Sequence, residues 1–129
     1  MLLICIALTA CTSQTGEKND KEKSDRFPIV VDGKWGYIDH TGTIVVTPQF
    51  DLAWHFSEGL AFVRIGGRDN GKWGCIDKTG KYIINPQFDD TWSFSEGLAA
   101  VKIGGRFFEE EGKGGYIDKT GKYVWEPTN

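Results

Sequence analysis

A motif that occurs three times in order constrains the fold of this 129-residue chain more than any other feature. Residues 33–39 read Gly-Lys-Trp-Gly-Tyr-Ile-Asp, and similar segments occupy residues 71–77 and 112–118. Pro-Gln-Phe-Asp and Phe-Ser-Glu-Gly-Leu-Ala each follow twice, so the chain holds two full copies and about half of a third. The copies lie at about residues 29–68, 69–106 and 107–129. Self-similarity at a nearly fixed spacing indicates a repeat architecture, in which each copy buries its face on its neighbour.

Each copy begins with the pattern of a β-hairpin. Residues 35–39 alternate and are rich in aromatic side chains, which is typical of a strand, and a β-branched run follows at residues 44–46. Between them stands Asp-x-Thr-Gly, which predicts a type I turn closed by a glycine with positive φ. The aspartates accept hydrogen bonds from the turn amides in this interpretation. The structural turn residues are Asp39, Gly42, Asp77, Gly80, Asp118 and Gly121.

The turn length predicts the pairing of the hairpin strands. With Asp39 opposite Thr43, Ile38 faces Ile44, and the next pairs are Tyr37 with Val45 and Gly36 with Val46. In the third copy the same register places Gly115 under the ring of Trp125. We expect the second strand to end at Pro48 and Pro86, because proline lacks the amide donor that a ladder requires.

A third strand is predicted at residues 60–65 and 98–103, where apolar side chains alternate. The aromatic-rich segment 50–58 before it should form a bend or one helical turn. The expected fold is therefore all-β: tandem antiparallel three-stranded units, stacked or gently curved. Two and a half units are too few for a closed propeller.

The first eleven residues have the layout of a lipoprotein leader. The apolar run at residues 2–10 is too short to span a bilayer but suits a signal-peptide core. It ends in Leu-Thr-Ala-Cys, which resembles the bacterial lipoprotein box, in which the cysteine is lipidated and becomes N-terminal on cleavage. We expect a signal peptide over residues 1–10 and a lipid on Cys11. The alternatives are an ordinary secretory signal, or a buried strand with an incidental cysteine.

The segment after Cys11 has the composition of a tether. Residues 12–26 contain no apolar side chain larger than threonine, and their acidic and basic side chains balance. Such a segment cannot offset its ordering entropy by burying apolar surface. We therefore expect residues 11–26 to be an acylated, flexible tether and residues 27–129 to be the folded domain, held on the extracytoplasmic side of a membrane.

The three copies together are similar to the WG-repeat proteins of bacteria. The resemblance rests on Gly-Lys-Trp/Gly-Gly-x-Ile-Asp-x-Thr-Gly, Pro-Gln-Phe-Asp and Ser-Glu-Gly-Leu-Ala, and it covers the whole presumed domain from residue 27 onward. The departures are Gly114, which replaces the tryptophan, and the missing end of the last copy. The family implies β-rich repeats, often in envelope proteins, with no agreed enzymatic activity and with binding to other proteins as the usual expectation.

The residues themselves favour binding over catalysis. A catalytic site is usually one irregular place, whereas the aspartates and Glu58 and Glu96 recur once per copy. His40 and His55 occupy a turn and a bend, and Cys75 replaces a strand tyrosine. No zinc-like or calcium-loop spacing occurs, so we expect no metal and no cofactor. With 15 basic and 18 acidic residues there is no basic excess, and we expect no nucleic-acid partner.

The aromatic residues are the candidates for recognition. We expect Trp35 and Trp73 to pack between copies. The candidate binding residues are Trp54, Trp92, Tyr123 and Trp125. The predicted function is a non-catalytic protein-interaction module of a cell-envelope lipoprotein. The alternative is glycan or cell-wall binding through the repeated aromatic residues.

The incomplete third copy suggests where a protein partner would bind. Its hairpin lacks a third strand of its own, so it should pair with residues 98–103 of the preceding copy. That arrangement leaves residues 123–125 as an apolar sheet edge, which invites pairing with a partner or a second copy. The alternative is that Pro127 and the inserted Phe107 and Phe108 cover this edge.

The lipid anchor gives the first testable prediction. Replacing Cys11 by serine removes the thiol that would carry the lipid. We expect labelled palmitate to be lost from the variant, and the protein to be released from the membrane or left unprocessed. Equal incorporation of label into the variant and the wild type would contradict the assignment.

Overall fold

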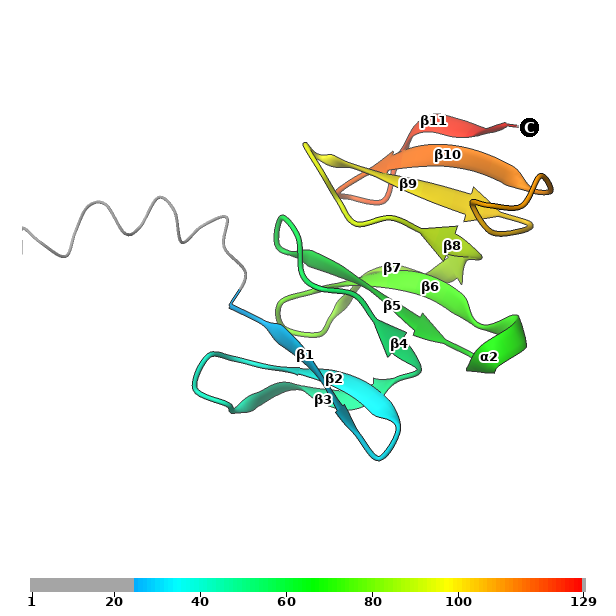
Figure 1. Ribbon diagram of the computed structural model, residues 1–129. Coiled ribbons are helices and arrows are strands. Elements are labelled where there is room, and N and C mark those ends of the chain that lie inside the picture. The colour runs from blue at the N-terminus through cyan, green and yellow to red at the C-terminus, as the bar shows by residue number, and fades with distance from the viewer. Residues whose placement is uncertain (1–24, 129) are drawn as a thin grey trace, which may run out of the picture.

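The computed structural model describes residues 25–128, which form three antiparallel sheets stacked in chain order (Figure 1). The first sheet contains β1 (Phe27–Val31), β2 (Lys34–Ile38) and β3 (Ile44–Phe50). The second contains β4 (Leu52–Ala53), β5 (Leu60–Ile65), β6 (Lys72–Asp77) and β7 (Tyr82–Phe88), and the third contains β8 (Asp90–Thr91), β9 (Leu98–Ile103), β10 (Lys113–Asp118) and β11 (Tyr123–Thr128). A single helical turn, α2 (Gly67–Asn70), joins β5 to β6. The predicted signal peptide, Cys11 and most of the tether lie outside the described residues.

The sheets are offset from the copies seen in the sequence. Strand β5 ends the first copy but pairs with β6 of the second, and β9 pairs with β10 in the same way. The third hairpin therefore rests on β9, as predicted. Strand β1, which the repeat pattern does not reveal, plays the same part for the first hairpin. The chain thus builds three complete sheets from two and a half copies, with no closed propeller.

The predicted turns are present in all three hairpins. Gly42, Gly80 and Gly121 have φ of +87°, +91° and +91°. The amide of Asp39 donates to the carbonyl oxygen of Thr43 at 2.9 Å, and Ile38 lies opposite Ile44 as expected. The structure therefore confirms the predicted pairing of the residues next to the turn.

The register beyond this point differs from the prediction because β3 contains a bulge. Tyr37 lies opposite Val46, not Val45, and Trp35 lies opposite Phe50. A side chain on Gly36 would place its Cβ 2.5 Å from the Val46 carbonyl oxygen, so Gly36 lies directly on the bulged backbone and not under a side chain.

The third hairpin shows the same correction. Tyr116 lies opposite Trp125, and Gly115 packs against the backbone of Trp125 and Pro127. The expected contact between a bare glycine and the indole ring is wrong. Nor do Pro48 and Pro86 end their strands, which continue to Phe50 and Phe88, because each proline lies in the irregular stretch where its missing donor is not needed.

Because of the bulge, one strand contributes side chains to the cores on both faces of its sheet. Strand residues two apart normally share a face, but an extra residue between them reverses this. Tyr82 packs against the core between the first and second sheets, whereas Ile84 belongs to the core between the second and third. Ile83, between them, is the unpaired residue.

Two apolar cores hold the stack together, and the second sheet contributes to both. Phe62 of β5 belongs to the core between the second and third sheets, with Phe94 and Ile117. The adjacent Val63 belongs to the core between the first and second sheets, with Tyr37. This confirms the alternation predicted for this strand. Trp73 is buried and Trp35 is partly buried, as expected for packing between copies.

The segment between β3 and β5 forms a short strand and not a helical turn. Strand β4 pairs with β5 through Leu52 opposite Arg64 and Ala53 opposite Val63. Phe50 and Phe56 are buried, whereas Trp54 remains partly exposed. The short strand moves the chain from the first sheet to the second and carries Trp54 to the surface.

The turn glycines give a prediction for stability. A Cβ on Gly80 would lie 3.2 Å from the side chain of Val46 in the sheet below, whereas a Cβ on Gly42 would have no neighbour within 4 Å. Gly80→Val should lower the free energy of unfolding by about 1–3 kcal/mol through positive φ alone, with a further loss from the contact. Gly42→Val is the control for the backbone effect. Equal urea-denaturation losses in the two variants would contradict the packing of this turn on Val46.

Candidate binding groove

An aromatic groove opens between the second and third sheets. Its cavity of about 340 Å³ is lined by Trp54, Asp90, Thr91, Trp92, Ser93 and Phe108. Trp54 and Trp92 occupy equivalent positions in the first and second copies. The stacking of the sheets therefore brings two exposed indoles to a single cavity.

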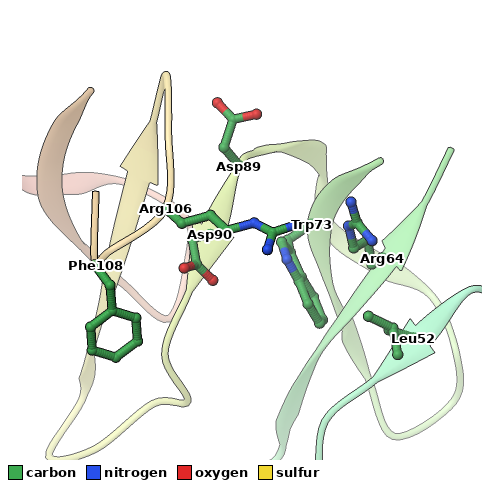
Figure 2. A pocket seen from close by; sticks show the side chains of 7 residues that line it. All are labelled: Leu52, Arg64, Trp73, Asp89, Asp90, Arg106 and Phe108. Carbon is green, nitrogen blue, oxygen red and sulfur yellow. The ribbon is translucent and has the colours of Figure 1, made fainter. Parts of the chain in front are cut away.

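A second hollow of about 310 Å³ adjoins the aromatic groove and shares Asp90 and Phe108 with it. Figure 2 shows Trp73, Arg64 and Leu52 on the side of the second sheet, with the guanidinium of Arg106 reaching from the third sheet toward Trp73. This part of the surface combines apolar rings with carboxylates and guanidinium groups.

Trp54 is held in place by a ring stack and by its backbone. Its indole lies parallel to that of Trp73, with centroids 5.4 Å apart and an interplanar angle of 4°. Its amide donates to the carbonyl oxygen of Phe62 at 3.0 Å. Because Trp73 covers one face of the indole and Trp54 is still 46% exposed, the ring presents a fixed surface to the groove.

Trp92 cannot make the same stack, because Gly114 stands where the earlier copies have tryptophan. Its partner is Phe107, which meets it edge-on with centroids 5.9 Å apart. Phe107 belongs to the inserted segment between β9 and β10. Trp92 is 55% exposed. The insertion therefore replaces the missing indole with a ring from another element.

Partly buried hydrogen bonds fix the inserted loop. The ammonium group of Lys102, which is itself buried, donates to the carbonyl oxygens of Arg106 and Glu109 at 2.6 and 2.5 Å. The Oδ2 of Asp90 accepts from the amide of Phe107 at 3.1 Å. The loop thereby holds Phe108, whose side chain is 90% exposed, at the mouth of the groove.

Phe107 and Phe108 were not predicted as site residues. The sequence signal that could have found them is the insertion itself, which begins with two phenylalanines at a place where the preceding copy has Asp69 and Asn70. The proposed alternative role of this loop, covering the edge formed by β11, is wrong. The loop packs beside β8, which lies at the opposite edge of the third sheet from β11.

The other two candidate binding residues lie elsewhere. Trp125 is 61% exposed on the outer face of the third sheet. Tyr123 is partly buried and packs against the core between the second and third sheets, because the bulge at Val124 separates it from Trp125. The structure therefore brings Trp54 and Trp92 together and leaves Trp125 and Tyr123 out of the groove.

The repeated sheets coincide with two matches to a known family of repeats. The family model described as WG containing repeat matches residues 35–68 and 73–107, which together make up more than half of the chain. The chain belongs to the WG-repeat family. We found no match to this WG-repeat chain among curated proteins or solved structures.

The repeated aspartates of the WG-repeat chain close its turns. The Oδ1 of Asp77 accepts from the Thr79 hydroxyl at 2.6 Å and from the amides of Thr79 and Lys81 at 2.8 and 3.1 Å. Asp39 and Asp118 make the same contacts. The threonine hydroxyl, followed by the backbone amides, holds the pKa of these carboxyl groups below the usual range. Their stabilising effect is therefore present above the ordinary aspartate pKa and is lost as the pH falls.

The other potentially reactive side chains in the described part of the chain differ in their exposure. His40 and His55 are exposed, and Cys75 is buried. Burial raises the pKa of the Cys75 thiol to about 12, which keeps it protonated and unreactive. Among residues 25–128 no group of three His, Cys, Asp or Glu side chains is placed to hold a metal ion, and no helix is long and apolar enough to cross a membrane.

Proposed function

We propose that this WG-repeat chain is a non-catalytic binding module that holds a saccharide chain in the aromatic groove. The observation that carries the proposal is the presence of two exposed tryptophans in one cavity whose other lining residues include a carboxylate and two hydroxyls. A pocket with apolar walls and a few fixed polar groups is the usual form of a small-ligand site.

The chemistry of the groove suits a sugar. The apolar face of a pyranose ring packs on an indole, while its hydroxyl groups need hydrogen-bond partners at the ring edge. Trp54 and Trp92 offer the rings, and Asp90, Ser93 and Arg106 offer polar groups beside them. The hydroxyl of Thr91 is buried and has no hydrogen-bond partner among the described residues, so a ligand hydroxyl would satisfy it after a small displacement.

The carboxylates next to the groove are held in place by backbone amides and by Lys72. The two oxygens of Asp90 accept from the amides of Thr91 and Phe107 at 3.0 and 3.1 Å. Asp89 pairs with Lys72 and accepts from the amide of Gly104. These contacts hold the two carboxylates in place and leave further lone pairs of Asp90 for ligand hydroxyl groups.

A lipid on Cys11 would place this domain at the surface of a membrane in the cell envelope. The support for that part of the proposal is the apolar leader that ends in Leu-Thr-Ala-Cys and the balanced charges that follow it. A module on a short tether would meet envelope polysaccharides without leaving the membrane.

Substitutions at the groove test the saccharide proposal. Trp92→Ala and Trp54→Ala should each weaken binding to isolated cell-wall polysaccharide by about tenfold or more, which corresponds to about 1.4 kcal/mol. Trp125→Ala, which removes an exposed indole from a different face, is the matched control and should bind as the wild type does. Retention of full binding by both groove variants, or an equal loss in the control, would contradict the proposal.

A second candidate function, protein binding, is favoured by a different part of the surface. Strand β11 is the last strand of its sheet, and Val124 and Trp125 are exposed on it. An edge strand with apolar side chains can pair with or pack against another chain. Val124 and Trp125 do not line the groove, so substitutions at these two residues test protein binding separately from saccharide binding.

A further inference from the structure

The two ends of the stack expose the two halves of an interface that the chain already uses twice. Within the stack, the apolar face of one sheet packs on the facing apolar face of the next, first between the first and second sheets and again between the second and third. The C-terminal end face consists of Leu98, Ala100, Tyr116 and Trp125. The N-terminal end face consists of Phe27, Ile29, Ile38 and Ile44.

The C-terminal end face corresponds to the surfaces that are buried lower in the stack. Tyr116 occupies the position of Tyr37 and Cys75, which are both 0% exposed, yet it is 48% exposed. Trp125 occupies the position of Val46 and Ile84, which lie in the two cores. The residues that would be covered by a fourth sheet are therefore open in the described structure.

The N-terminal end face corresponds to the faces of the second and third sheets that pack on the sheet before them. Ile38 occupies the position of Ile76 and Ile117, which are fully buried. Ile44 occupies the position of Tyr82 and Tyr123, which pack against the cores, but is itself 52% exposed.

The sizes of the side chains at the two ends are complementary. Phe27 stands where the later sheets have Ala61 and Ala99, so the N-terminal end face carries an extra ring. Ala100 stands where the second sheet has Phe62, and a hollow of about 450 Å³ lies at this end. Leu98, Ala100 and Tyr116 line it, and Trp92 and Ser93 line both this hollow and the aromatic groove. A large side chain on one end thus matches a hollow at the other.

The turn contacts repeat in the same direction. The turn at Gly80 lies over Val46 of the sheet below, and the turn at Gly121 lies over Ile84. Gly42 occupies the equivalent turn position in the first sheet, where an added Cβ would have no neighbour within 4 Å. Trp125 occupies the position of Val46 and Ile84 in the third sheet, and no turn of the described residues covers it. The open turn and the open strand position are the missing partners of this contact.

The charged groups at the edge follow the same rule. Lys119 pairs with Glu58 of the sheet below at 3.9 Å, and Lys78 pairs with Asp25 at 3.4 Å. Glu96 is the equivalent of Glu58 in the next copy, and His40 is the equivalent of Lys78 and Lys119 in the first turn. A further sheet stacked on the third would therefore place the turn residue His40 next to Glu96. Both are exposed and make no ion pair within the described residues.

We propose that the C-terminal end face binds the N-terminal end face of a second copy of this chain, which continues the stack from one molecule to the next. The inference rests on the protein-binding function proposed above and names the partner. Such a contact is head-to-tail, so it leaves a free face at each end and permits longer assemblies. Side-chain burial drives it, and Glu96 and His40 set its direction.

Two substitutions, one on each end face, test the direction of the contact. Trp125→Glu and Ile44→Glu both replace exposed side chains and should leave the fold intact, which circular dichroism of each variant checks. Native mass spectrometry of the full chain, released from a detergent that disperses the apolar leader, counts the copies. We expect dimers and longer assemblies of the wild type that grow with concentration.

Each variant alone should be monomeric, because each lacks one of the two faces. An equimolar mixture of the variants should form one-to-one heterodimers and nothing longer, because each supplies the face that the other lacks. Phe108→Glu, at the groove, is the control and should assemble as the wild type does. This pattern is the signature of a head-to-tail contact.

Three results would overturn the inference. The first is a wild-type chain that is monomeric at all concentrations. The second is dimerisation of Ile44→Glu alone, which pairing of two β11 edges would produce. The third is equal association of all variants, which the apolar leader would produce. Capture of a different protein through Trp125 by a monomeric chain would overturn self-association yet leave the protein-binding function standing.

Discussion

The architecture depends on the bulge in the second strand of each hairpin. A regular strand would place the residues on either side of Val45, Ile83 and Val124 on one face of the sheet. The extra residue sends them to opposite faces, so Tyr82 supports the core below and Ile84 the core above. The glycine of each Trp-Gly or Gly-Gly pair permits this, because any larger residue would collide with the bulged backbone, as at Gly74, where a Cβ would lie 2.7 Å from the carbonyl oxygen of Ile84. The close backbone contact at the glycine therefore permits the bulge, and the bulge in turn allows side chains to pack on both faces of the sheet.

The features that the sequence predicts correctly are those whose determining interactions are local. The turns at Asp39, Asp77 and Asp118 follow from a side chain that bonds to amides two and four residues ahead. The strands at Leu60–Ile65 and Leu98–Ile103 follow from alternation alone. The register beyond Tyr37 could not be derived, because it depends on how closely Gly36 approaches Pro48 across the ladder. Strand β1 was missed because its sequence, Phe-Pro-Ile-Val-Val, does not repeat the later copies.

The groove arises where the repeat is broken. Aligned copies predicted that Trp54 and Trp92 are equivalent, but not that both line one cavity, since that depends on the stacking distance of two sheets. The ring of Phe107 beside Trp92 compensates for the change of tryptophan to Gly114 in the third copy. Lys102 and Asp90 hold the inserted loop, and their equivalents in the first copy are Arg64 and Leu52. Regular copies build the scaffold, and departures from the repeat build the surface that is suited to binding.

Because both cores meet in the second sheet, the stability of the domain should be concentrated there. Hydrogen–deuterium exchange of the chain in dilute solution tests this most directly, because each amide reports the free energy of the opening that exposes it. The amides of β6, which lies inside a sheet buried on both faces, should exchange most slowly. Those of β1 and β11, at the edges of the two end sheets, should exchange fastest. Slowest exchange in β10, or equal protection of β11 and β6, would show that the third sheet is stable by itself and that stability is not concentrated in the second sheet.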